Sequence, residues 1–274
     1  MSDRDILEKE LDAPFSLSQE QIDFYKENGY LKLNQILSPE LIEHYRPEIG
    51  RKVAELNTQR LPMERRSTYD KAFLQIMNLW TKSDVVREFV FGKRLARVAT
   101  ELMGCRGVRV YHDQALYKEA GGGLTPWHAD QYYWPVSNDH MVTAWVPLQD
   151  TPLEMGPLAF CPRSHRFQYG RDLEISDQSE MTLKKALQHF GSDETPFALG
   201  DVSFHAGWTF HRAGANNTTR AREVMTVIYM DTDMLLVAPK NKSQAVDIER
   251  WCPGTSVGDL IASPLNPIIY ELER

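Results

Sequence analysis

Residues 108–130 read VRVYHDQALYKEAGGGLTPWHAD and mark the point at which the hydrophobic pattern of the chain changes. Upstream of this segment apolar residues recur at helical spacing, whereas from Val108 onward they alternate with a period of two, as in strands. Turn-forming residues such as Gly121-Gly122-Gly123 separate these short strands. Helices followed by many short strands predict an α+β or mainly β fold, with a sheet sandwich or barrel flanked by helices.

Helix signals extend over the N-terminal part, about residues 16–104. Ser18 and Gln21 fit a capping box, and Gly29 is placed to end that helix. Ser38-Pro39 begins another helix with proline at its first position, and the stretch at 30–33 between them alternates as a short strand. The sequence therefore predicts a helical N-terminal part and a β core at about 105–235.

A long polar insertion interrupts the β core at about 163–199, with one predicted helix at 183–190. Connections of this length often serve as lids or binding loops. The chain has 274 residues and no internal repeat, which is long for one domain and short for two independent ones. We expect a single domain, 1–274, with the insertion as a lid.

Composition and charge indicate which kinds of partner and which compartment the protein has. The net charge is −7 and no long basic run occurs, which argues against nucleic-acid binding. No stretch approaches the roughly 18 apolar residues that span a bilayer, and the charged first dozen residues do not resemble a secretory signal. Three cysteines without a C-x-x-C pair indicate reduced thiols. A cytoplasmic protein with a small-molecule partner is predicted, and the oligomeric state stays open.

Potential metal ligands lie within and downstream of the opening segment. On an extended strand His128 and Asp130, two residues apart, direct their side chains to the same face. A further histidine, His211, follows far downstream, and two histidines with one carboxylate suit a non-haem Fe(II) oxygenase. His205 is an alternative distal ligand, but its neighbours lack the Asn and Arg spacing found after His211. For the other histidines that have no partner at ligand spacing, including His112, structural roles are favoured.

With Trp127-His128-Ala129-Asp130, His211 and Arg220-Ala221-Arg222 in place, the chain resembles the phytanoyl-CoA dioxygenase family of Fe(II)/2-oxoglutarate-dependent oxygenases. The resemblance covers nearly the whole chain and includes the motifs Gln114-Ala115-Leu116-Tyr117-Lys118, Trp145-Val146-Pro147-Leu148, Met155-Gly156-Pro157-Leu158, Pro162-Arg163-Ser164-His165 and Gly200-Asp201-Val202. It implies a double-stranded β-helix (jelly-roll, cupin-like) core flanked by N-terminal helices. It also implies Fe(II), with 2-oxoglutarate as cosubstrate and O2 as oxidant.

Residue roles follow from the same resemblance. His128, Asp130 and His211 become the iron ligands, and Arg222 holds the distal carboxylate of 2-oxoglutarate, for which its planar fork is suited. Arg220, two residues away, is the competing candidate. Trp145 and Gln114 take positions beside the cosubstrate.

Two positions depart from the family pattern. The family frequently has a serine two residues after the distal histidine, where this chain has Ala213, so the second hydroxyl must come from elsewhere or be missing. The usual glycine before Ser-His is Arg163. The carboxylate of Asp130 is intact, whereas related halogenating enzymes have a small residue there, which favours hydroxylation.

Aromatic residues surround the metal motif and form either the wall of a substrate pocket or part of the barrel core. They are Trp127, Tyr132, Tyr133 and Trp134, and Gln75 and Asn78 are further candidates for the roof of the site.

The predicted activity is hydroxylation, or a related oxidation, of an unactivated C–H bond of a small molecule, with release of succinate and CO2. The alternatives are a non-catalytic cupin-like metal-binding or sensor protein and a protein-residue hydroxylase. No Lys/Arg cluster announces a coenzyme A thioester.

Overall fold

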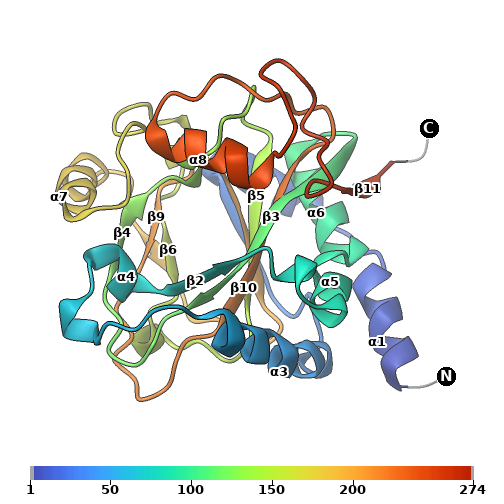
Figure 1. The fold of residues 1–274 in the computed structure, drawn as a ribbon, viewed down its shortest axis with the longest axis horizontal. Helices are drawn as coiled ribbons and strands as arrows, with labels where there is room; N and C mark the ends of the chain where they lie inside the picture. Colours follow the sequence, from blue (N-terminus) through green and yellow to red (C-terminus); the bar gives the residue numbers. More distant parts are fainter. Residues whose placement is uncertain (1–2, 273–274) are drawn as a thin grey trace.

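The computed structural model describes residues 3–272, with most helices in the N-terminal part and most strands after residue 106 (Figure 1). The helices are α1 (Asp3–Asp12), α2 (Gln19–Asn28), α3 (Pro39–Leu56), α4 (Thr68–Ala72), α5 (Asp84–Val90), α6 (Lys93–Met103), α7 (Asp177–Ala186) and α8 (Lys242–Trp251). The strands are β1 (Tyr30–Leu33), β2 (Leu74–Met77), β3 (Gly107–Tyr117), β4 (Thr125–His128), β5 (Met141–Pro147), β6 (Leu158–Phe160), β7 (Asp193–Glu194), β8 (Val202–Ala206), β9 (His211–Ala213), β10 (Val224–Asp231) and β11 (Ile268–Glu271). Short 3-10 helices include η2 (Leu79–Thr81) and η3 (Asp130–Tyr133).

Two antiparallel sheets form the centre of the molecule. The larger has the strand order β1-β8-β5-β10-β3-β11, with β2 also paired to β3, and the smaller has the order β4-β9-β6-β7. Helices α1, α3, α5 and α6 lie outside the larger sheet, along the bottom and right of the view, while α8 lies at the top (Figure 1). This is the jelly-roll core with flanking helices that was expected.

The helical part and the β core are more interleaved than the predicted boundaries of 16–104 and 105–235. β1 and β2 come from the N-terminal part and pair with β8 and β3, and β11, beyond residue 235, also pairs with β3. Backbone N–H and C=O groups at a sheet edge need partners, and these three strands supply them. Within the described range 3–272, no helix combines the length and hydropathy needed to cross a bilayer.

The α2 boundaries follow the expected capping chemistry. The Ser18 hydroxyl accepts from the Gln21 N–H at 3.2 Å, and the Gln21 side chain accepts from the Ser18 N–H at 2.8 Å, which is the predicted capping box. Gly29 ends the helix with φ +82°, and a Cβ there would lie 2.4 Å from His165 Nδ1. A side chain at this position is excluded both by conformation and by space.

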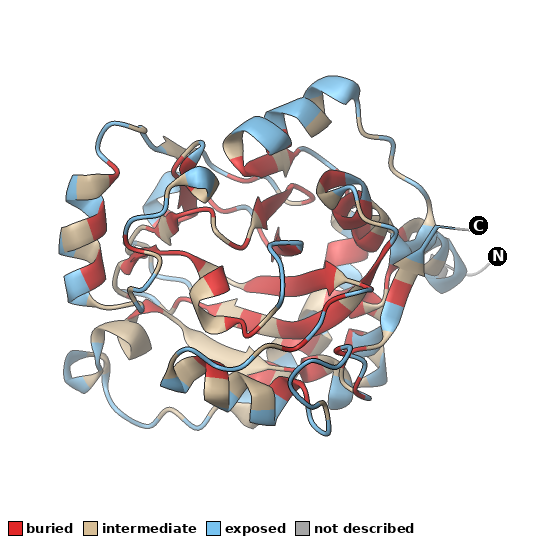
Figure 2. Cartoon of the chain, turned by 90° about the horizontal axis from the view of Figure 1, so that it is seen from above, coloured by how far each residue is buried: buried red, intermediate tan, exposed pale blue. Residues whose placement is uncertain are grey.

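Side chains alternate across the larger sheet. On β5, Val142, Ala144 and Val146 face the helices and join the main apolar core, while Thr143 and Trp145 face the interior between the sheets. Figure 2 shows buried residues concentrated in these strands and on the inward faces of the helices. Burial of these apolar side chains drives the helical layer onto the sheet.

Strand β3 is continuous from Gly107 to Tyr117 and joins the alternating stretches at 108–111 and 115–118. The pairing with β10 shifts between Ile228 and Tyr229, so that Tyr111 is an additional residue on β3. Such a bulge bends the strand and changes which residues face inward. Val108 and Val110 point to the helices before the bulge, whereas Ala115 does so after it.

Helix α7 starts earlier than the predicted 183–190. Its N-terminus is fixed by a capping box between Ser176 and Ser179, with acidic Asp177 in the first turn. Lys184 and Lys185 lie in the last turn, and the chain leaves the helix at Leu187. The capping pattern, rather than the apolar spacing further on, decides where this helix lies.

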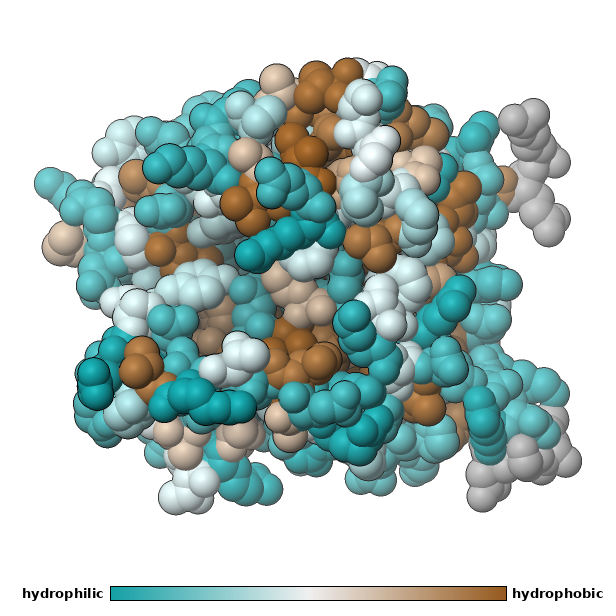
Figure 3. All heavy atoms as spheres, viewed as in Figure 1, coloured by the Kyte–Doolittle hydropathy of each residue, from teal (hydrophilic) through white to brown (hydrophobic). Residues whose placement is uncertain are grey.

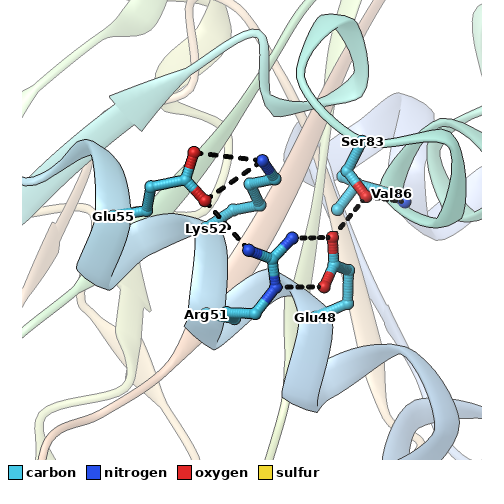
Figure 4. A network of polar contacts seen from close by, with 6 residues as sticks. All are labelled: Glu48, Arg51, Lys52, Glu55, Ser83 and Val86. Atoms are coloured by element: carbon cyan, nitrogen blue, oxygen red, sulfur yellow. Dashed lines mark hydrogen bonds and ion pairs between the residues drawn. The ribbon is translucent and has the colours of Figure 1, made fainter.

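A surface network ties α3 to α5 (Figure 4). Arg51 binds Glu48 through two bonds of 2.7 Å and also contacts Glu55 at 2.9 Å. The Ser83 hydroxyl, which caps α5, donates to Glu48 at 2.6 Å. These hydrogen bonds lower the pKa of Glu48 to about 2, with Arg51 as the largest cause.

Candidate active site

Three potential metal ligands meet at the edge of the smaller sheet. His128 ends β4 and is paired in register with His211, which begins β9, while Asp130 begins η3. Asp130 Oδ1 lies 3.6 Å from His128 Nε2 and 3.7 Å from His211 Nε2. One ligand atom from each residue lies within 4.8 Å of the others. This geometry brings together two imidazoles and a carboxylate, the donor set typical of non-haem Fe(II).

Backbone carbonyls orient both imidazole rings. His128 Nδ1 donates to the Pro126 carbonyl at 2.7 Å, and His211 Nδ1 donates to the Thr209 carbonyl at 2.9 Å. Each ring therefore carries a proton on Nδ1 and directs Nε2 toward Asp130. Fixing the tautomer in this way is the usual means of preparing a histidine for a metal.

Two side chains fix the carboxylate of Asp130. Its Oδ2 accepts from Thr143 Oγ1 at 3.1 Å and lies 3.2 Å from His205 Nε2, leaving Oδ1 for the two candidate ligands. Burial alone would raise the pKa of Asp130, but His211, His128 and His205 together hold it well below its usual range. His205 thus contacts the carboxylate and lies outside the ligand group, to which it was an alternative candidate.

Arg222 is a buried cation on the cavity wall. Its side chain is 1% exposed, its Nη1 donates to the Gly156 carbonyl, and its Nε has no hydrogen-bond partner. Its guanidinium lies 5.4 Å from the ring centre of Trp145. Burial lowers the pKa of Arg222 to about 9. No carboxylate of the described residues forms an ion pair with it, so the site fits an anionic ligand. Arg220 is exposed and does not line the cavity.

A hydroxyl lies across from Ala213, where the family serine is missing. Thr125 on β4 pairs in register with Ala213 and lines the cavity. Its Oγ1 accepts from the buried Lys118 Nζ at 3.1 Å. Burial, followed by repulsion from Arg222, lowers the pKa of Lys118 to about 6. Thr125 could not be predicted from the sequence, because the pairing of β4 with β9 is not encoded by nearby spacing.

The second departure from the family pattern also has a structural account. Arg163 has φ +65°, a left-handed conformation that glycine adopts most easily. Its N–H donates to the Asn28 carbonyl at 2.9 Å. The turn before Ser164 is therefore preserved with arginine in place of glycine.

A single cavity of about 350 Å³ opens onto the candidate ligands, Arg222 and Trp145. Gln114 also lies on its wall and accepts from Gln75 Nε2 at 2.5 Å, and Gln75 in turn accepts from the Tyr69 hydroxyl at 2.6 Å. This chain of hydrogen bonds links α4, β2 and β3 along one side of the cavity.

The predicted pocket residues separate into two groups. Gln75, Tyr133 and Trp134 line the cavity. Asn78, Trp127 and Tyr132 lie outside its lining.

Local packing explains each of the three that lie outside the lining. Trp127 points to the other face of β4 and packs in an apolar cluster with Leu183 of α7. Asn78 has a left-handed backbone conformation at the start of η2. The backbone of Tyr132 is bound to α8, because its carbonyl accepts from Gln244 Nε2 at 2.9 Å.

Helix α8 supplies cavity residues that the analysis of the sequence missed. Its contribution to the lining consists of Lys242, Ser243, Val246, Asp247, Arg250 and Trp251. Figure 3 has the same view as Figure 1 and shows apolar side chains at the surface between the positions of α8 and β2. The sequence contains a start signal for this helix, because Asn241 is a capping residue and Gln244 follows three residues later. Gln244 then fixes α8 to η3, the segment that carries Asp130.

Comparison with known proteins supports the same chemistry. The family described as Phytanoyl-CoA dioxygenase (PhyH) matches residues 25–224. The chain belongs to this family. The group formed by His128, Asp130 and His211 suits the iron of such an enzyme, and the chain is an Fe(II)/2-oxoglutarate-dependent dioxygenase. The non-catalytic metal-binding or sensor protein considered as an alternative is not favoured.

Individual relatives of this phytanoyl-CoA dioxygenase family protein are distant. A probable alpha-ketoglutarate-dependent hypophosphite dioxygenase of Stutzerimonas stutzeri is 22% identical over 221 residues, covering 76% of this chain and 77% of the relative. The crystal structure of SnoK, a non-heme alpha ketoglutarate dependent carbocyclase from nogalamycin biosynthesis, is 25% identical with a TM-score of 0.77, covering 94% of this chain and 100% of SnoK. EctD from S. alaskensis with 2-oxoglutarate and 5-hydroxyectoine shares the fold at 22% identity, with a TM-score of 0.67 and coverage of 81% and 79%.

Proposed function

We propose that this enzyme hydroxylates, or otherwise oxidises, an unactivated C–H bond of a small molecule held in the 350 Å³ cavity, with release of succinate and CO2. The observation that carries the proposal is that the His128, Asp130 and His211 group and the unpaired guanidinium of Arg222 open onto the same cavity. A metal site alone would not need a buried, unpaired cation beside it. A dicarboxylate cosubstrate does.

In the proposed site His128, Asp130 and His211 hold Fe(II), and Arg222 with Thr125 holds the distal carboxylate of 2-oxoglutarate. Trp145 and Gln114 flank the cosubstrate. When iron and 2-oxoglutarate are bound, the chemistry they supply is activation of O2 for attack on a C–H bond. The protein contributes ligand orientation and exclusion of water.

Charge states in the site agree with these roles. Burial, with repulsion from His128 and His205, holds the pKa of His211 well below its usual range, so its imidazole is neutral at pH 7. Asp130 is ionised for the reason given above. Neutral imidazole and ionised carboxylate are the forms that bind a divalent metal.

A small-molecule substrate is favoured over a protein residue because the cavity is closed by several elements. Residues of α4, β2 and α8 line it together with Ile175 from the 163–199 insertion. The Tyr133 hydroxyl accepts from the Ile175 N–H at 3.0 Å, which joins the insertion to the cavity wall. This contact supports the proposal that the insertion serves as a lid.

We place the enzyme in the cytoplasm and expect no nucleic-acid partner. Cys105, Cys161 and Cys252 are all free thiols, and burial raises their pKa values, which makes them inert as nucleophiles. Free thiols of this kind suit a reducing compartment. We treat residues 1–274 as one domain.

The test is anaerobic addition of Fe(II) to the purified protein, followed by 2-oxoglutarate, with the weak visible charge-transfer band of the chelated keto acid as the readout. We expect the band in the wild type and a weaker one in Arg222→Lys, because a point charge replaces the planar fork. Arg220→Lys, two residues away and exposed, is the matched control and should behave as the wild type. Iron binding without a band in the wild type would refute the proposal.

A further inference from the structure

One part of the cavity wall has no role in holding iron or 2-oxoglutarate. It is formed by His112 of β3 and by Asp247 and Trp251 of α8. We call these three residues the β3–α8 wall. Their side chains are polar or aromatic, and sequence spacing assigned His112 only a structural role.

The bulge in β3 explains why His112 reaches the cavity. Val110 faces the helices before the bulge, and after it His112 and Gln114 face the interior. Tyr111, the additional residue, packs on the same inner side with Trp134 and Trp251. An uninterrupted strand would direct Val110 and His112 to the same face, so the bulge re-aims the imidazole toward the cavity.

His112 carries an unused hydrogen-bonding atom. The residue is 4% exposed, and its Nδ1 has no hydrogen-bond partner among the described residues. Its ring lies 5.1 Å from the Trp251 ring. Buried polar atoms are nearly always satisfied, so the imidazole of this cavity-lining residue needs a partner that the described residues do not supply.

Asp247 is held in place with acceptor capacity to spare. Its Oδ2 accepts from the Tyr111 hydroxyl at 3.2 Å, and its Oδ1 accepts from Trp251 Nε1 at 3.1 Å. Burial raises the pKa of Asp247 to about 7. The ionised form has about four acceptor sites and the protonated form can also donate, so both forms can bind hydroxyl groups beyond these two bonds. No ion pair to Asp247 is formed by the described residues, which leaves its charge to be satisfied by hydrogen-bond donors.

The charges around this wall select the kind of ligand. The cations on α8, Lys242 and Arg250, also line the cavity but are exposed, whereas Asp247 is partly buried beside Tyr111 and Trp251. Arg222 is committed to the cosubstrate in the proposed site. An acid placed against the β3–α8 wall would therefore meet a carboxylate, while hydroxyl groups would find acceptors. Apolar neighbours such as Met77 and Trp251 suit the carbon skeleton of a ring.

We propose that the β3–α8 wall is the substrate-recognition subsite of this enzyme and that it takes a neutral ring bearing hydroxyl groups, such as a glycoside or a cyclitol. This inference rests on the proposed oxygenase function. His112 and Asp247 hydrogen-bond the hydroxyl groups, and Trp251 packs against the ring.

The experiment uses three phenyl ethers of the same ring size as probes for the anaerobic Fe(II)·2-oxoglutarate protein, with affinity measured by isothermal titration calorimetry. Phenyl β-D-glucopyranoside carries hydroxyl groups and no charge, phenyl β-D-glucuronide adds a carboxylate, and 2-phenoxytetrahydropyran lacks hydroxyl groups. We expect the glucoside to bind about tenfold or more tightly than the tetrahydropyran, and more tightly than the glucuronide.

Variants assign this preference to the wall. In His112→Phe and in Asp247→Leu the preference should fall to about one, while His112→Gln, which can still hydrogen-bond, should keep part of it. Glu249→Gln is the matched control, because Glu249 is exposed on α8 and does not line the cavity. Thermal unfolding and the charge-transfer band establish that each variant is folded and loaded.

Each contrary result overturns the proposal. These are equal binding of glucoside and tetrahydropyran, tighter binding of the glucuronide, persistence of the preference in both His112→Phe and Asp247→Leu, or absence of binding by all three probes while the band forms. The two hypotheses fail separately, since a missing band with selective glucoside binding would refute the oxygenase function and leave the subsite intact.

Discussion

Strand β5 presents Val142, Ala144 and Val146 to the helices, and Thr143 and Trp145 to the cavity. The two faces of the larger sheet thus differ completely in chemistry although they alternate along the same strands. The outer face is largely apolar and covered by α3, α5 and α6, whereas the inner face places hydroxyl, imidazole and amide groups around a cavity.

Because successive side chains of a strand point to opposite faces of the sheet, the residues that stabilise the fold and the residues that act in the site lie on opposite faces of the same strands. Burial of apolar area on the outer face supplies the free energy of folding. This stabilisation offsets the cost of burying polar atoms that have no hydrogen-bond partner around the cavity, such as Arg222 Nε and His112 Nδ1. A substitution should therefore affect mainly one property according to the face it lies on.

The largest expected effect in the cavity comes from His211→Ala, on the smaller sheet that faces this inner side. Loss of one of the two imidazoles should abolish 2-oxoglutarate turnover, measured as succinate release, because the iron site loses a ligand. The free energy of unfolding, measured by urea titration, should change by less than about 2 kcal/mol, since little apolar packing is lost. Retained turnover would contradict the assignment of His211.

The outer face should show the converse result. Phe204 on β8 is fully buried in the main core, and Phe204→Ala should lower the free energy of unfolding by about 3–5 kcal/mol. Protein that remains folded should still give the charge-transfer band with Fe(II) and 2-oxoglutarate. A folded variant with no band would show that the two faces are coupled, and the separation would need revision.

A smaller effect, on the affinity for 2-oxoglutarate, is expected at Thr125. Thr125→Val removes one hydroxyl donor to a carboxylate and should weaken 2-oxoglutarate binding about tenfold. Ala213, its partner across β4 and β9, offers a matched rescue. In the double variant Thr125→Val with Ala213→Ser, most of the lost affinity for 2-oxoglutarate should return, as measured by calorimetry. If neither the single nor the double variant changes this affinity, Thr125 does not bind the cosubstrate.

The smallest effect is expected outside both faces, at the α3 network in Figure 4. Glu48→Gln should cost at most about 1 kcal/mol at pH 7, because the ion pairs are largely solvent-exposed. The pKa of Glu48 is lowered to about 2, so its contribution is complete above the unfolded value near 4.5 and is lost as pH falls through 2. The difference between wild type and variant in urea unfolding should therefore vanish over this range, and a constant difference would contradict it.

Local chemistry made much of the fold predictable. The capping box of α2, the proline start of α3 and the period-two strands depend on contacts between residues close in sequence. The helix of the insertion was misplaced because the apolar spacing near Leu187 was followed instead of the Ser176 cap. The bulge at Tyr111 could not be predicted, because it depends on register against β10.

The sequence by itself determined a mixed helix and strand fold through its periodicity, and its ordered motifs indicated the family, with the jelly-roll core and the candidate ligands His128, Asp130 and His211 that this resemblance implies, since periodicity and motifs are local properties. Only the tertiary structure placed Thr125 opposite Ala213, re-aimed His112 through a bulge and brought α8 over the cavity. The physical reason is that these three features depend on pairing and packing between segments that lie far apart in the chain. Their energies come from the assembled sheet, and no single stretch of sequence contains them.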